Sequence, residues 1–114
     1  MKPRKMKLFG GDGMEKVAGL SEEKLKKIVE FLRERDAKKI YVFGSRARGD
    51  VKEGSDVDIL VEFGENAPKG FEFFALHHDI AEMIGIKVDV LTLQMLDPLI
   101  RGEVEKEAIL IYEE

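Results

Sequence analysis

Short apolar runs alternate along this chain with stretches of helical periodicity, and this alternation constrains the fold more than any other feature. The run 39–43 (KIYVF) stops at Gly44 and predicts a strand buried on both faces. Further runs predict a second, a third and a short fourth strand, at 56–63 (DVDILVEF), 86–93 (IKVDVLTL) and 108–112 (AILIY).

Helical signals fill the spaces between these runs. Residues 22–35 carry an apolar stripe at helical spacing, formed by Leu25, Ile28, Val29 and Leu32, and Ser21 precedes them as a suitable N-cap. A second helix is predicted from residue 70 to about Gly85, and a third starts at Pro98 with Asp97 as its N-cap. Helices that alternate with strands predict an α/β domain around a mostly buried sheet.

Length and composition limit the classes of protein to which the chain can belong. With 114 residues it is expected to form one domain over 21–114, after a loosely ordered lead-in at 1–20. No apolar run approaches the roughly 20 residues of a membrane span, and the start has no secretory signal. The net charge of −4 argues against a general nucleic-acid binder, and the lack of cysteine fits a cytoplasmic protein.

Two aspartates inside the second apolar run are the first chemical signal. Asp56 and Asp58 are two residues apart in a predicted strand, so both side chains should emerge on the same face. Two carboxylates at such a short distance repel each other unless a cation neutralises them. Arg46, Arg48 or Lys52 could do so as an ion pair, or a divalent metal could; oxygen ligands alone favour Mg²⁺ or Mn²⁺ over Zn²⁺.

Asp89 strengthens the metal interpretation, because it lies in another strand-like run and adds a third carboxylate to the predicted cluster. Gly44 and Ser45 follow a strand and should open a turn whose backbone N–H groups can hold phosphate. A Walker A loop is rejected. Gly44 and Gly49 have its spacing, but Asp50 and Val51 replace the required Lys and Ser or Thr.

These residues resemble the signature of the DNA polymerase β-like nucleotidyltransferase superfamily. That signature is Gly-Ser, ten residues, then Asp-x-Asp, and it reads here as Gly44-Ser45, residues 46–55, and Asp56-Val57-Asp58. The surrounding GSRARGD and GSDVDILV are similar to its minimal nucleotidyltransferase (MNT) branch, over about residues 22–112. The resemblance implies an α/β (α+β) nucleotidyltransferase fold, with a mixed sheet of about four strands flanked by helices.

The resemblance also implies roles for individual residues. Gly44 and Ser45 would hold the triphosphate of ATP, while Asp56 and Asp58 would bind two Mg²⁺ ions, for which Mn²⁺ could substitute. Asp89 would complete one metal site and help to activate the acceptor hydroxyl. Arg46 and Arg48 would steady phosphates or the partner.

The implied reaction is transfer of AMP from ATP to a hydroxyl group, expected to be a tyrosine of a HEPN-domain toxin. The protein would then be the antitoxin of that toxin and form a hetero-oligomer with it. Two alternatives remain open: a non-catalytic module that neutralises its partner by binding, and a nucleotidyltransferase acting on a small molecule. The second is disfavoured because the chain has no room for a substrate-binding second domain.

Three other features have a structural and a functional interpretation. His77 and His78 are consecutive in a predicted helix, about 100° apart, and cannot chelate one ion from one face. Core packing is the default for the apolar group formed by Phe71, Phe73, Phe74 and Leu76, with base stacking as the alternative. The segment 91–100 (LTLQMLDPLI) could face a partner or the core.

Overall fold

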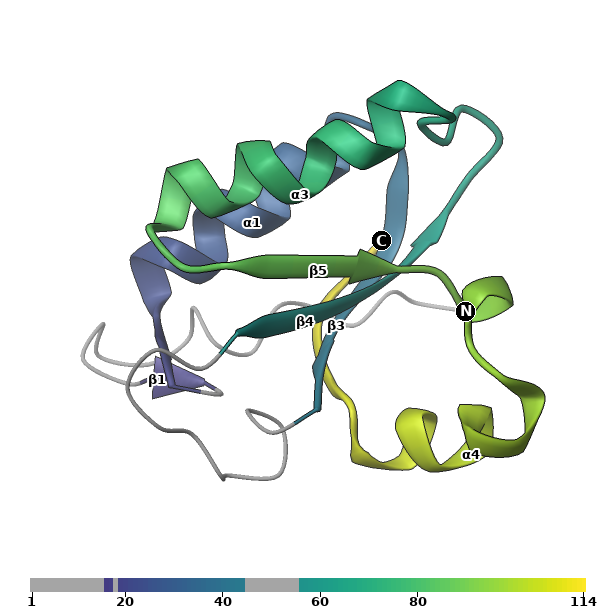
Figure 1. The fold of residues 1–114 in the computed structure, drawn as a ribbon. Coiled ribbons are helices and arrows are strands. Elements are labelled where there is room, and N and C mark those ends of the chain that lie inside the picture. The colour runs from purple at the N-terminus through teal and green to yellow at the C-terminus, as the bar shows by residue number, and fades with distance from the viewer. Residues whose placement is uncertain (1–15, 18, 45–55) are drawn as a thin grey trace.

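A mixed four-stranded sheet is the centre of the fold. The computed structural model describes residues 16–17, 19–44 and 56–114 (Figure 1). The sheet has the order β5-β4-β3-β6. Strands β4 and β5 are parallel, whereas β3 pairs antiparallel with both β4 and β6. These strands are β3 (Ala37–Phe43), β4 (Val57–Phe63), β5 (Val88–Leu91) and β6 (Ile109–Glu113). The predicted mixed sheet of about four strands is therefore confirmed.

Helices α1 (Glu22–Arg33) and α3 (Phe71–Ile84) lie side by side over one face of this sheet, as Figure 1 shows. All four residues of the predicted apolar stripe of α1 are buried. The Ser21 side chain caps α1 by accepting a hydrogen bond from the Lys24 N–H at 3.3 Å. Helix α3 ends at Gly85, whose φ of 73° is the left-handed conformation that glycine adopts without strain.

Burial of β3 on both faces was predicted from its sequence, and that prediction is wrong. Ile40 and Val42 face the helices and are fully buried, but Tyr41 and Phe43 on the opposite face are only half-buried. The reason is that α1 and α3 cover the same face of the sheet (Figure 1). We call the other face, which carries Tyr41, Phe43, Asp58 and Asp89, the open face.

The third strand is shorter than the predicted 86–93. β5 spans four residues and is followed by a 3₁₀ turn, η2 (Leu93–Met95), and by α4 (Pro98–Glu107). The Asp97 carboxylate accepts the Leu99 N–H at 2.8 Å, which confirms Asp97 as the N-cap of α4. Helix α4 has no buried residue and lies away from α1 and α3 in Figure 1.

A short antiparallel pair, β1 (Lys16–Val17) with β2 (Leu20–Ser21), precedes α1. Leu20 is fully buried in the main hydrophobic core. Most of the predicted lead-in lies outside the described residues, so its loose order and the domain boundary at residue 21 stay predictions.

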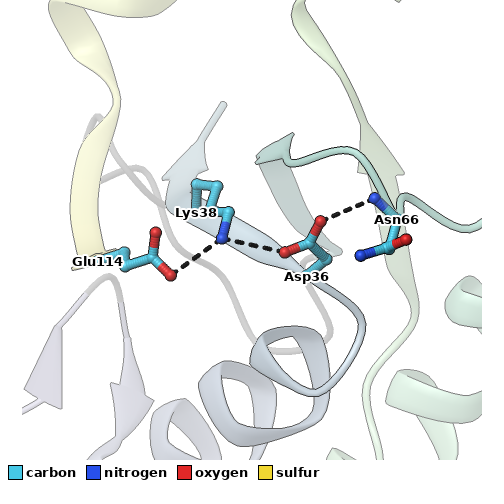
Figure 2. Close-up of polar contacts among 4 residues, drawn as sticks. All are labelled: Asp36, Lys38, Asn66 and Glu114. Carbon is cyan, nitrogen blue, oxygen red and sulfur yellow. Dashed lines mark hydrogen bonds and ion pairs between the residues drawn. The ribbon is translucent and has the colours of Figure 1, made fainter.

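A polar network joins three chain segments at the end of the sheet (Figure 2). Asp36, at a φ of 71°, accepts a hydrogen bond from the Asn66 N–H at 2.8 Å. Lys38 Nζ lies 3.0 Å from a carboxylate oxygen of Asp36 and 3.0 Å from one of Glu114. Gly64 donates its N–H to the Asp36 carbonyl at 2.8 Å. The network thus connects the start of β3, the loop after β4 and the end of β6.

None of the helices in the described part of the chain is both long and apolar enough to span a bilayer.

Candidate active site

Asp58 and Asp89 lie side by side on the open face. They are register partners on the parallel strands β4 and β5. Neighbouring strands are about 4.8 Å apart, so side chains in register project from the same face as close neighbours. The residues on either side of Asp58, Val57 and Ile59, are fully buried on the helix-covered face. The alternation of β4 therefore presents a carboxylate to the half-exposed open face while its neighbours contribute to the core.

Gly44 closes against this carboxylate at the end of β3. Phe43 is the antiparallel register partner of Asp58, which brings Gly44, the next residue, alongside β4. A Cβ atom at Gly44 would overlap Oδ2 of Asp58 and lie 3.2 Å from its Cγ. Gly44 also has a φ of 78°, in the left-handed region. Two independent constraints, conformation and space, therefore require glycine beside Asp58.

Asp56 immediately precedes β4 and is in contact with a cation that the sequence interpretation missed. Lys87 Nζ lies 3.9 Å from Asp56 Oδ2, with both side chains substantially exposed. The cations named from sequence, Arg46, Arg48 and Lys52, lie outside the described residues, as does Ser45. The signal for Lys87 was its spacing: it precedes Asp89 by two residues, as Asp56 precedes Asp58.

The oxygen donors at this end of the open face suit a hard divalent cation. Within residues 16–17, 19–44 and 56–114, no group of three or more His, Cys, Asp or Glu side chains is already arranged to hold a metal. Mg²⁺ is usually bound through one or two carboxylates together with substrate phosphates and water. The neighbouring carboxylates of Asp58 and Asp89 fit that pattern. The three-aspartate site that includes Asp56 stays a prediction.

Helix α3 forms a groove with the outer side of β5, next to Asp89. Its volume is about 490 Å³, and its lining includes Lys87 and Asp89 from the strand side. The other lining residues are Phe74, His77, His78, Ala81 and Val88. Asp89 therefore borders both the open face and this groove.

The two consecutive histidines of α3 have different surroundings. His77 Nδ1 accepts the Val90 N–H at 3.1 Å, and its ring meets Phe73 edge-on at 5.8 Å. His78 is exposed and pairs with Glu82 one turn along the helix. Both histidines line the groove, but they have different partners, and their inability to chelate one ion stays a prediction. The contact of His77 with β5 could not be predicted from the sequence, because it spans thirteen residues and has no local pattern.

The default of core packing holds for only part of the aromatic group of α3. Phe73 packs against the core and Leu76 is buried, but Phe71 and Phe74 are 93% and 72% exposed. Helical geometry explains the difference, since residues 71 and 74 lie outside the stripe of α3 that packs into the core, which includes Leu76 and Ile80. In the segment 91–100, Leu96 is buried whereas Leu99 is 89% exposed, so a partner-facing role for that segment stays a prediction.

Tyr41 occupies the open face away from the aspartates. Its hydroxyl donates to Glu62 Oε2 at 3.4 Å. Burial raises the pKa of Tyr41 above its usual value near 10, and the negative charge of Glu62 raises it further. Tyr41 therefore stays a neutral phenol at physiological pH and adds no charge to this face.

The family of the chain follows from its match to a family model. The model described as "Polymerase beta, Nucleotidyltransferase" matches residues 26–114, which include the strands that carry Asp58 and Asp89. The chain belongs to this nucleotidyltransferase family. The resemblance inferred from the Gly-Ser and Asp-x-Asp motif is thereby confirmed.

Archaeal relatives cover most of this nucleotidyltransferase. The protein adenylyltransferase MntA of Thermococcus cleftensis is 40% identical over 81 residues, which are 70% of this chain and 81% of the relative. A protein of Methanocaldococcus jannaschii, named as a candidate protein adenylyltransferase, is 39% identical over 84 residues. That alignment covers 74% of this chain and 89% of the relative.

Solved structures share the fold. A structure described as a candidate minimal nucleotidyltransferase is 31% identical, with a TM-score of 0.67 over 76% of this chain and 88% of that one. A toxin-antitoxin complex with AMP-PNP has a TM-score of 0.69 at 23% identity, over 79% and 73% of the two chains. A tri-AMPylated HEPN toxin with its MNT antitoxin, from Shewanella oneidensis, has a TM-score of 0.64 at 20% identity, over 82% and 72%.

Proposed function

We propose that this nucleotidyltransferase is a Mg²⁺-dependent protein adenylyltransferase that transfers AMP from ATP to a hydroxyl group of a partner protein. The observation that carries the proposal is the contact region formed by Asp58, Asp89 and Gly44. Two carboxylates in register lie next to Gly44, and a nucleotide phosphate can approach the protein backbone closely at a glycine. The reaction takes place in the cytoplasm, where ATP is available.

In this reaction the acceptor oxygen attacks the α-phosphorus of ATP in line with the bond to the β-phosphate oxygen. A new P–O bond forms as that bond breaks, and pyrophosphate leaves. Asp89, which borders the groove as well as the open face, takes the proton of the acceptor hydroxyl. Gly44 and Ser45 hold the phosphates, and Arg46 and Arg48 add positive charge.

Asp56, Asp58 and Asp89 are the residues that would hold two Mg²⁺ ions. When bound, these ions would stabilise the charge that develops on the attacking and leaving oxygens. The exposure of Asp56 leaves its carboxylate accessible from solvent, and its distance of 3.9 Å from Lys87 is that of a weak surface pair.

The proposed acceptor is a tyrosine of a HEPN-type toxin, with this protein as the antitoxin. Support comes from the name of the Thermococcus relative, a protein adenylyltransferase, at 40% identity. Further support comes from the Shewanella complex, in which the toxin bound to an MNT antitoxin of the same fold is tri-AMPylated.

The test is a labelling reaction with the protein encoded beside this one. The two proteins are incubated with Mg²⁺ and ATP labelled at the α-phosphate, using wild type, Asp58→Asn and Asp89→Asn. Glu105→Gln, an exposed carboxylate on α4, is the matched control. We expect the neighbour to gain label with wild type and control only, and mass spectrometry to find the AMP on tyrosine.

Two outcomes would contradict the proposal. If the neighbour gains no label while still forming a complex, neutralisation by binding alone is favoured. If the two aspartate variants label as well as wild type does, the open-face carboxylates are not the catalytic groups.

A further inference from the structure

The strand that carries Asp89 is an edge strand, and α3 supplies its outer contact. Among the strands of the described residues, β5 pairs only with β4 in the order β5-β4-β3-β6, so one side of its backbone has no strand neighbour there. Edge strands expose unpaired N–H and C=O groups and are less constrained than central ones. Asp89 would therefore be held on one side only, unless another element fixed its strand.

His77 provides that second attachment through one hydrogen bond, which its Nδ1 accepts from the Val90 N–H. Its Nδ1 lies 3.1 Å from the amide nitrogen of Val90 and 3.4 Å from the carbonyl oxygen of Val88. These are the two residues that flank Asp89, and both of their side chains are buried in the core. The imidazole thus contacts the backbone at the two positions that determine where the carboxylate of Asp89 projects.

The direction of the hydrogen bond fixes the form of the imidazole. A backbone N–H can only donate, so Nδ1 of His77 must be the acceptor and carries no proton. The proton of the neutral ring then resides on Nε2. The edge-on contact with Phe73, with the ring planes at 81°, holds the imidazole in this orientation from within α3.

We propose that His77 is a positioning residue for Asp89. It fixes the edge of β5 so that the carboxylate stays aligned with Asp58 during nucleotide transfer, and it occupies the edge against addition of a further strand. This inference rests on the proposed function for its catalytic consequence, whereas the anchoring itself can be measured without any activity.

Three variants separate anchoring from packing. His77→Leu replaces the imidazole with an apolar side chain of similar size and removes the Nδ1 acceptor. His77→Asn keeps an acceptor oxygen close to the position of Nδ1. Glu72→Gln is the control, because Glu72 is exposed on α3 and does not line the groove beside Asp89.

We expect kcat to fall about 10- to 100-fold in His77→Leu, as for other residues that orient a metal ligand, with little change in KM for ATP. His77→Asn should recover most of this loss, and Glu72→Gln should behave as wild type. Hydrogen exchange of the Val90 amide should accelerate in His77→Leu and remain slow in the other two variants. In wild type, ¹⁵N NMR should find the His77 proton on Nε2.

The results that overturn the proposal are distinct from those that overturn the function. An unchanged Val90 exchange rate in His77→Leu, or a proton on Nδ1 of His77 in wild type, would show that β5 is not anchored in this way. A wild-type kcat in His77→Leu with accelerated exchange would show that Asp89 does not need the anchor. If wild type transfers no nucleotide at all, the proposed function fails, and the exchange and NMR measurements still decide the anchoring. These NMR data also decide it if His77→Leu does not fold.

Discussion

Gly44 and Asp58 approach each other so closely that no side chain fits between them. A Cβ at residue 44 would overlap the carboxylate of Asp58, which comes from the neighbouring strand. The backbone at Gly44 and the carboxylate of Asp58 therefore constrain each other, and a change in either position shifts the other.

Substitution of Gly44 by alanine should reduce both stability and transfer. In this variant, strain would come both from the left-handed φ of 78° and from the overlap of the new Cβ with Asp58. Backbone strain of this kind costs about 1–3 kcal/mol in unfolding free energy. Gly85→Ala is the matched control. It has a similar φ of 73° but no atom within 4 Å of the added Cβ. Urea unfolding should find Gly44→Ala less stable than Gly85→Ala, and equal losses would argue against the contact with Asp58.

Mg²⁺ should stabilise the folded protein through the open-face carboxylates. A ligand that binds only the folded state at a hundredfold excess over its Kd adds about 2.7 kcal/mol. The Tm of wild type should therefore rise with Mg²⁺ concentration, and that of Asp89→Asn should rise much less, since one of two neighbouring carboxylates is lost. Glu105→Gln should respond as wild type does. An equal rise in Asp89→Asn would indicate that the ion binds elsewhere.

The network around Asp36 should make stability depend on pH in the acid range. The hydrogen bond from the Asn66 N–H, followed by the contact with Lys38, lowers the pKa of Asp36 from its usual 3.8. A carboxyl with a lowered pKa in the folded state contributes stability above its unfolded pKa and loses it as pH falls through the folded one. The difference in unfolding free energy between wild type and Asp36→Asn should be full above about pH 5 and should shrink below pH 4. A difference that stays constant down to pH 2 would contradict this.

Gly64 lies close against the side chains of the same network. A Cβ there would lie 2.9 Å from Cγ of Asp36 and 2.6 Å from Cε of Lys38. Gly64→Ala should therefore lower the urea midpoint by displacing the Asp36–Lys38 pair. Gly102→Ala, in the interior of α4 with open space around it, should instead raise stability, by up to about 1 kcal/mol. Equal effects of the two substitutions would indicate that backbone propensity alone decides.

The sequence predicted the elements well because their signals are local. Ser21 and Asp97 cap the predicted helices, and Gly85 ends α3, since each acts on residues within one turn. Burial of Tyr41 and Phe43 was predicted wrongly, because an apolar run reports the strand but not which face the helices cover. The contacts of Lys87 with Asp56 and of His77 with Val90 join separate elements, so only the register of β4 with β5 and the packing of α3 reveal them.

The placement of α1 and α3 on a single face has a consequence for the selectivity of the reaction. Neither α1 nor α3 covers the face that carries Asp58 and Asp89, and both residues are partly accessible to water. Water is itself a nucleophile towards the α-phosphate, and enzymes suppress such side reactions by excluding solvent from the site. A docked partner protein would supply that exclusion, so the preference for transfer over hydrolysis would belong to the complex and not to this chain alone.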